Sequence, residues 1–206
     1  MTDVDPAGDW LGLVRSRRSI RRYKPDLLST DVIDRLVAAA TWAPSAHNRQ
    51  PWRFVVITQP QTKERLAGQM GARLRSDRLA DHDPAAAIEK DAARSYARIT
   101  TAPVVIVACL TMAEMDRYAD TRRKKAEYLM GTQSVAMAVQ NLLLTAHAEG
   151  LGACWMCAPL FCGDAVRQAL DLPADWEPQA LITLGRPDDP GKLASRRSPS
   201  EVSVKR

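Results

Sequence analysis

The densest group of chemically capable side chains lies early in the chain, between residues 17 and 24. This stretch reads RRSIRRYK and places five cations among eight residues. Such a cluster is costly to pack unless an anion neutralises it, although most charged runs are simply solvated surface. Ser19 and Ile20 interrupt the arginines, which indicates that some of these side chains point inward. An anion site and a solvated basic face are therefore both open readings.

A second polar cluster lies between two prolines, Pro44 and Pro51, and contains Ser45, His47, Asn48, Arg49 and Gln50. Pro44 cannot continue a helix interior, and Pro51 biases the residue before it towards extended geometry. A polar loop fixed at both ends between packed elements suits a polar ligand. An ordinary helix-to-strand connection explains the same pattern equally well.

Other catalytic chemistries find little support in the sequence. Cys154 and Cys157 form a CxxC, but Cys109 and Cys162 lack the spacing of a second ligand pair. The three histidines show no metal-ligand spacing, and there is no GxSxG, Walker or GxGxxG motif. We therefore expect no metal site. Two polar clusters without an evident nucleophile suggest that a bound cofactor carries the chemistry.

Length and composition indicate a single domain over residues 1–206, since 46% of the chain is hydrophobic. A net charge of +5, dispersed among 24 acidic residues, is too weak for a nucleic-acid binder. No apolar run approaches the roughly 20 residues of a membrane span. Residues 1–9 are polar and do not resemble a signal peptide, so we expect a cytoplasmic protein with a loose N-terminus. Residues 186–206 form an extended, mostly polar C-terminal tail.

The periodicity predicts an α+β fold, because strands and helices do not alternate as regular βαβ units. Residues 104–110 are apolar throughout and predict a central strand that is covered on both faces. The longest helix is expected over 125–149 and is stopped by two glycines. A charged loop at 77–84 is a candidate lid. The other expected strands cover 54–57, 153–156 and 180–185, and the other helices cover 10–18, 30–42, 61–76, 85–99 and 163–170.

Three motifs carry a resemblance to a known family: RRSIR at 17–21, APSAHNRQPW at 43–52 and GLGACW at 150–155. Together they resemble the FMN-dependent nitroreductase family, and the likeness extends from residue 10 to 197. GLGACW, with LPADWEP at 172–178 and GRP at 185–187, is most similar to one branch. That branch is the C-terminal domain of the γ-glutamyl ligase that finishes the deazaflavin (factor-420) coenzyme. Ligase activity is not implied, because the ligase domain is not in this sequence.

The resemblance implies a nitroreductase-like fold, with a central mixed sheet of four strands flanked by helices. It implies a homodimer with FMN at the interface, and a fifth strand that the partner's C-terminal tail could add. The matched cofactor-binding positions form four groups. They are Arg17, Arg18, Ser19, Ile20 and Arg21 for the phosphate and pyrimidine edge; Pro44, Ser45, Ala46 and Asn48 from the other subunit; Met156 and Cys157 at flavin N5 and O4; and Arg196 and Arg197 in the tail. Cys157-Ala158 stands where many members carry Glu-Gly, so side-chain effects there would differ.

The activity implied is hydride transfer from NAD(P)H through flavin N5 to a nitroaromatic or quinone-like acceptor, with ping-pong kinetics. No catalytic side chain is then required, and Arg21 is the candidate cation near flavin N1. An alternative is a reductase or binding protein for the deazaflavin coenzyme or its dehydro precursor. Arg73, Arg75 and Arg78 could meet the acidic tail of that coenzyme, although such arginines are more often solvated.

Overall fold

The computed structural model describes residues 6–206 and the side chains from residue 10 onward. The first helix, α1, spans Pro6–Ser16. The expectation of a loose lead-in is therefore wrong for residues 6–9, because Pro6 is well placed at the start of a helix. Its remaining part, residues 1–5, lies outside the described residues. Three large apolar side chains of this helix, Trp10, Leu11 and Val14, are exposed.

Four strands form one sheet in the order β1-β2-β4-β3. Every neighbouring pair is antiparallel, so the expectation of a mixed sheet is wrong. An isolated bridge between Ser19 and Ala153 supplies a parallel pairing outside the named strands. Buried strands read as similar apolar runs in either orientation, so sequence could not settle direction. The bounds are Trp52–Ile57 for β1, Val104–Leu110 for β2, Gly152–Met156 for β3 and Glu177–Gly185 for β4.

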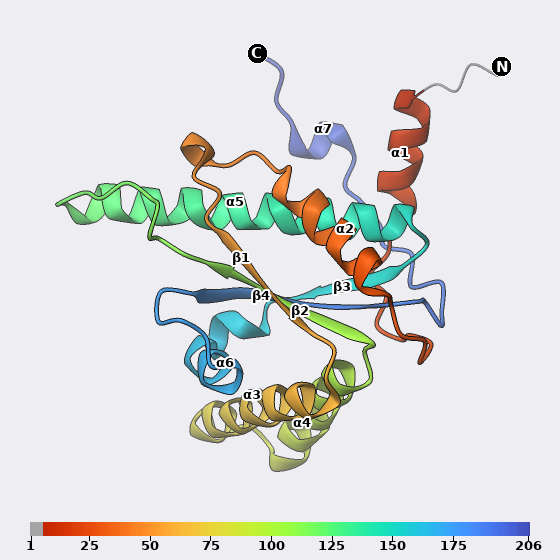
Figure 1. The fold of residues 1–206 in the computed structure, drawn as a ribbon, viewed down its shortest axis with the longest axis vertical. Helices are drawn as coiled ribbons and strands as arrows, with labels where there is room; N and C mark the ends of the chain where they lie inside the picture. The colour runs from red at the N-terminus through yellow and green to blue at the C-terminus, as the bar shows by residue number, and fades with distance from the viewer. Residues whose placement is uncertain (1–5) are drawn as a thin grey trace.

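Helices cover both faces of the sheet (Figure 1). On one face, α2 (Thr30–Thr41) and α5 (Thr121–Ala148) pack their apolar stripes against alternate residues of β2, including Ile106. On the other face, α3, α4 and α6 pack against Val105 and Val107. All seven residues of β2 are buried, which confirms the expected central strand. The second-face helices span Pro60–Ala80, Ala85–Thr100 and Gly163–Leu170.

Helix α3 continues through Ala80, so the expected lid at 77–84 is wrong for its first half. The extension is held by Arg78, which forms ion pairs with Asp83 at 2.5 Å and Asp91 at 2.7 Å. These pairs fasten the end of α3 to the connection that follows it and to the first half of α4. The charges that suggested a mobile loop therefore stabilise a helical hairpin.

Residues 17–24, which we call the arginine strap, run between α1 and α2 and pair with two distant segments. The Ile20 N–H donates to the Ala153 carbonyl at 3.1 Å, which fixes the strap to β3. The Lys24 N–H donates to the Arg186 carbonyl at 2.9 Å, and the Asp188 N–H donates to the Arg22 carbonyl at 3.1 Å. The first part of the C-terminal tail therefore lies against the strap. The remaining short helices are η1 (Ala46–Asn48), η2 (Ala158–Phe161) and α7 (Pro199–Val202).

None of the four cysteines, all of which lie in the described part of the chain, forms a disulfide. Between residues 6 and 206, no helix is both long and apolar enough to cross a membrane. The same residues contain no group of three or more His, Cys, Asp or Glu arranged to hold a metal ion.

Candidate functional site

The arginine strap lies so close to β3 that only glycine fits at the contact. A Cβ atom added to Gly152 would lie 2.7 Å from both Cβ and Cγ2 of Ile20, which is closer than real Cβ atoms approach. Ile20 is itself buried, with 7% of its surface exposed. The glycine of the GLGACW motif therefore allows Ile20 to be inserted while its arginine neighbours remain outside.

A second glycine lets the C-terminal tail cross the strap. Gly191 has φ = +73°, and a Cβ there would lie 2.7 Å from the Cβ of Arg18 and 2.8 Å from Cδ1 of Ile20. Both the positive φ and the close approach exclude an ordinary side chain. The strap is thus enclosed between β3 and residues 186–191.

Tyr23 anchors the far end of the strap. Its hydroxyl lies 2.6 Å from the Ile20 carbonyl and 2.7 Å from Oγ1 of Thr183. Burial raises the pKa of Tyr23 well above its ordinary value, so the phenol stays neutral. A neutral hydroxyl with these contacts is a fixed tie between the strap and β4.

The strap and the tail line a cavity of about 200 Å³ with cations. Four strap residues, Arg17, Arg18, Ser19 and Arg21, face Lys192 and Arg196 across it. Among the described residues, Arg17, Arg18 and Arg21 take part in no ion pair. An anion entering this cavity would therefore meet arginines that no carboxylate of the described chain already neutralises.

A larger cavity of about 750 Å³ shares Ser19, Arg21 and Lys192 with the first. Helix α4 adds Arg94 and Arg98, which the sequence analysis missed. Their spacing of four places them on one helix face, which is the signal that could have found them. Arg94 forms an ion pair with Asp91 at 2.6 Å, whereas Arg98 takes part in none among the described residues.

Two of the strap arginines, Arg18 and Arg21, are oriented by backbone carbonyls. Arg18 donates from Nη1 to the Arg15 carbonyl at 2.6 Å and to the Arg17 carbonyl at 2.9 Å. Arg21 donates from Nη1 to the Ser19 carbonyl at 3.3 Å. Carbonyl contacts restrict these guanidinium groups without removing their charge.

His147, near the end of α5, lies close enough to Arg17 and Arg18 for their charges to affect its pKa. Its Nε2 lies 2.7 Å from Oγ of Ser16. Partial burial lowers the pKa of His147, and the charges of Arg17 and Arg18 lower it further. In its neutral form the histidine therefore connects α5 to the end of α1, immediately before the strap.

The proline-bounded loop adopts a strained conformation. His47, Asn48 and Gln50 have φ values of 49°, 53° and 50°, in the left-handed region that non-glycine residues rarely occupy. Hydrogen bonds to side-chain oxygens help to hold the loop, among them Ala46 N–H to Oγ of Ser134 at 3.2 Å and Gln50 N–H to Oγ of Ser45 at 3.0 Å. Backbone strain of this kind persists where surrounding contacts enforce it and often marks a binding site.

Within one chain, the strap and the loop do not meet. The strap begins beside His147 and the loop rests on Ser134. These positions are thirteen residues apart on α5, or about 20 Å at 1.5 Å per residue. Figure 1 shows the two segments at different parts of that helix, the loop above its middle and the strap beyond the base of α1.

The remaining predicted site residues divide between the strap and its surroundings. Met156 ends β3, three residues after the strap contact at Ala153, and Cys157 follows it. The Nε1–H of Trp155 donates to Sγ of Cys157 at 3.1 Å, so this thiol has a defined position. In the tail, Arg196 lines the cationic cavity, whereas Arg197 is not among the residues that line it.

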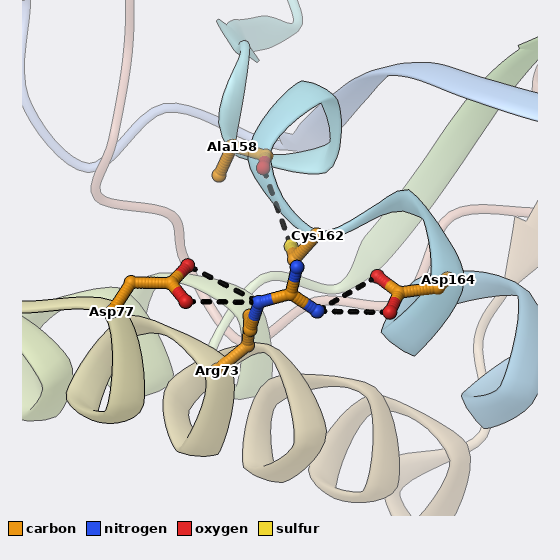
Figure 2. Close-up of polar contacts among 5 residues, drawn as sticks. All are labelled: Arg73, Asp77, Ala158, Cys162 and Asp164. Carbon is orange, nitrogen blue, oxygen red and sulfur yellow. Dashed lines mark hydrogen bonds and ion pairs between the residues drawn. The ribbon is translucent and has the colours of Figure 1, made fainter. Parts of the chain in front are cut away.

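The three arginines considered for an acidic coenzyme tail are all engaged in ion pairs. Arg73 lies between Asp77 and Asp164, at 3.0 Å and 2.8 Å, beside Cys162, whose Sγ donates to the Ala158 carbonyl (Figure 2). Hydrogen bonding to Arg73 lowers the pKa of Asp164. Arg75 pairs with Glu89 at 2.8 Å, and Arg78 pairs as described above. All three have structural partners.

Comparison with known proteins agrees with this architecture. The model of the family described as "Nitroreductase family" matches residues 14–186. A protein of Methanothermobacter thermautotrophicus named "Putative NADH dehydrogenase/NAD(P)H nitroreductase" is 30% identical over 89% of this chain and 80% of its own length. Protein DrgA of Synechocystis is 29% identical over 95% of this chain and 93% of its own.

Among solved structures, a "putative nitroreductase in complex with fmn" from Desulfovibrio desulfuricans is 28% identical, with a TM-score of 0.73. The alignment covers 98% of both chains. A BluB-like flavoprotein from Clostridium difficile has a TM-score of 0.77 at 22% identity, which shows the shared fold. The chain belongs to the nitroreductase family, and its α+β fold is that of these relatives.

Proposed function

We propose that this protein is an FMN-dependent oxidoreductase of the nitroreductase type, with the FMN phosphate held in the cationic cavity of the strap. The observation that carries this proposal is a cavity of about 200 Å³ lined by Arg17, Arg18 and Arg21, which form no ion pair within the described part of the chain. Phosphate oxygens prefer guanidinium donors, and such charge-assisted hydrogen bonds contribute roughly 1.5–3 kcal/mol each. Ser19 and the tail cations Lys192 and Arg196 complete the donor set. The residues present therefore fit the phosphate of a flavin nucleotide.

The adjoining cavity of about 750 Å³ suits the ring system. Arg21 lines both cavities. We assign Arg21 the role of the cation that favours negative charge on the reduced ring, with Arg98 as a second contributor from α4. Bound FMN supplies hydride transfer between a nicotinamide donor and a second substrate. The solved relative from Desulfovibrio desulfuricans, which carries FMN, supports this cofactor.

The protein would act as a homodimer in which each flavin contacts two chains. The strap and the loop that carries Pro44, Ser45, Ala46 and Asn48 are separated by about 20 Å along α5 within one chain. A second copy can bring its own loop to the strap, Met156 and Cys157 of the first. This arrangement gives a physical reason for the strained loop, because its geometry would be enforced by the partner's cofactor.

The expected donors are NADH and NADPH, as the name of the Methanothermobacter thermautotrophicus relative suggests for that protein. The expected acceptors are nitroaromatic or quinone-like compounds reduced by a ping-pong mechanism. The absorption spectrum of the purified protein tests the cofactor directly. Oxidised-flavin bands that bleach anaerobically with NADH or NADPH are the expected result. A protein that neither carries nor binds FMN contradicts the proposal.

Arg17→Ala provides a variant-level test of the phosphate site. We expect a folded protein that has lost most of its flavin, whereas Lys90→Ala, at an exposed position of α4, keeps it. Full flavin occupancy in Arg17→Ala would contradict the assignment of this side chain.

A second candidate function is reduction or binding of the deazaflavin coenzyme or its dehydro precursor. It is favoured by the GLGACW and LPADWEP motifs, which are most similar to the deazaflavin-related branch. The two functions are separated by comparing steady-state rates with nitrofurazone and with the dehydro precursor. Binding of the coenzyme without any flavin bleaching by NADH or NADPH would favour a carrier role.

A further inference from the structure

A separate cavity of about 880 Å³ lies where β2 ends and α5 begins, away from the arginine strap. This volume falls within the range of about 300–1,000 Å³ typical of ligand pockets. Its floor is apolar, with Leu110 and Met112 beside Tyr118 and Tyr128. Such a floor suits a flat aromatic ring.

The carboxylates around this cavity are all occupied by protein partners. Asp116 pairs with Arg49 at 2.7 Å, and Asp175 accepts a hydrogen bond from Oγ1 of Thr111 at 2.8 Å. Glu177 accepts from Tyr128 and from Gln179. Glu127, only 1% exposed, accepts the Asp116 N–H at 3.1 Å. Asp116 is thus neutralised by a cation, whereas the other three carboxylates keep their charge and are oriented by neutral donors.

Three cations that line the cavity have no such partner among residues 10–206. Arg117, Lys124 and Lys125 take part in no ion pair or side-chain hydrogen bond with the described residues, and all three are exposed. A ligand entering the cavity meets apolar and aromatic side chains, the exposed carboxylates of Asp175 and Glu177, which neutral donors already hold, and three cations that are still without a partner in the described chain. The complementary ligand is therefore an aromatic compound that carries a negative charge.

The cavity wall is continuous with the proline-bounded loop. The Arg49–Asp116 pair joins the loop to the segment after β2, and the Thr111 N–H donates to the Pro51 carbonyl at 2.9 Å. The buried Glu127 fixes the same segment to α5. If the loop of one chain lies against the flavin of the partner chain, the cavity, being joined to the loop, lies beside that flavin as well.

We propose that the cavity binds the electron acceptor and selects anionic aromatic compounds, with Arg117 and Lys124 contacting the negative group and Met112 and Tyr118 the ring. The inference rests on the proposed function, because the loop must bring the cavity to a flavin. For a nitroaromatic acid, two electrons and two protons convert the nitro group to a nitroso group and water. An N–O bond breaks in this step. NAD(P)H supplies the electron pair and one proton as hydride, solvent supplies the second proton, and NAD(P)⁺ is the other product.

The test compares 4-nitrobenzoate with its neutral analogue 4-nitrobenzamide by isothermal titration calorimetry on the purified protein. We expect the wild type to prefer the anion. Arg117→Ala with Lys124→Ala should weaken 4-nitrobenzoate binding by at least about tenfold, the effect of losing one charge-assisted contact, and should leave 4-nitrobenzamide unchanged. The matched control, Arg122→Ala with Lys90→Ala, removes the same charge from two exposed positions that do not line the cavity.

Steady-state kinetics on the same samples supply the second readout. The KM for 4-nitrobenzoate should rise in parallel with the loss of affinity, while the KM for NAD(P)H stays constant. Equal affinity for the acid and the amide, or an anion preference that survives in the double variant, overturns the proposal. A rise confined to the KM for NAD(P)H also overturns it, because the cations would then serve the donor. Flavin absorbance is recorded throughout, so that absence of flavin is recognised as failure of the proposed function. The preference for 4-nitrobenzoate over 4-nitrobenzamide is measured by calorimetry in either case.

Discussion

Gly152 and Ile20 lie so close that any Cβ on the glycine would be 2.7 Å from the Cβ of the isoleucine. This contact places the strap against β3, and the adjacent hydrogen bond from Ile20 N–H to the Ala153 carbonyl sets its register. Because Arg18, Ser19 and Arg21 flank Ile20, the position of the proposed phosphate site depends on a single missing side chain.

Gly152→Ala should therefore displace the strap. We expect a loss of about 1–3 kcal/mol in the free energy of unfolding, the usual effect of overpacking a core contact, together with weaker FMN binding. Thermal unfolding and flavin titration measure both. Gly68→Ala is the matched control, because Gly68 lies inside α3 with nothing within 4 Å of an added Cβ. That change should stabilise the protein by about 0.5–1 kcal/mol. Equal flavin affinity in the two variants would contradict the role of Gly152.

The strained loop predicts an unusual response at Gln50, whose φ is 50°. The free energy of unfolding of Gln50→Gly should exceed that of Gln50→Ala by about 1 kcal/mol, because a left-handed conformation costs roughly that much for a residue with a Cβ. Both variants lose the amide of Gln50 and its hydrogen bond, so they differ only in the Cβ, which opposes a left-handed backbone. Denaturant unfolding curves provide the measurement, and identical stabilities would show that the loop is unstrained.

His147 should respond to the charge of the strap and of its ligand. The pKa of His147 is lowered by partial burial and by Arg17 and Arg18. The neutral form is thus favoured on folding, so the associated stability is present above a pH of about 6.5 and is lost as the pH falls through the lowered pKa. A phosphate bound between these arginines would offset their charge and raise the pKa again. NMR titration with and without FMN measures this, and an unchanged pKa would place the phosphate elsewhere.

The Arg73–Asp164 pair joins α3 to α6, and its contribution to the stability of the protein should depend on pH in the acid range. The pKa of Asp164 is lowered by its hydrogen bonds to Arg73, so the stability it supplies is present above the ordinary aspartate pKa of about 3.9 and is lost as the pH falls through the lowered value. Because both side chains are partly exposed, the effect should be small. The difference in Tm between wild type and Asp164→Asn should shrink below that pH, whereas a constant difference would implicate packing instead.

Much of the fold could be read from the sequence because its signals are local. The apolar run at 104–110 predicted the buried central strand, and the glycines at 150 and 152 predicted the end of α5. The mixed sheet that the resemblance implied was wrong, and a short apolar run carries no orientation that could have corrected it. The helical end of α3 was missed because Asp77 and Arg78 look like loop charges until their partners are known, which are Arg73 one turn earlier on α3 and Asp91 on α4.

The site was recognised only where its residues are close in the sequence. The strap and the proline-bounded loop are compact motifs, so their residues could be named in advance. Arg94, Arg98 and Lys192 join the strap only through the packing of α4 and the return of the tail. The cavity beside α5 could not be predicted from the sequence either, because the carboxylates near Arg117 and Lys124 meet their hydrogen-bond and ion-pair partners only in the folded chain.

The most direct test of the two-chain site is flavin content in a mixed dimer. One chain carries Arg17→Ala and Arg21→Ala in the strap, and the other carries a loop substitution, such as Asn48→Ala, chosen because its own homodimer loses flavin. If strap and loop from different chains share each flavin, the mixed dimer contains one intact site and recovers about half of the wild-type flavin, although each parent homodimer has little. A mixed dimer that stays as flavin-poor as both parents would contradict the shared site.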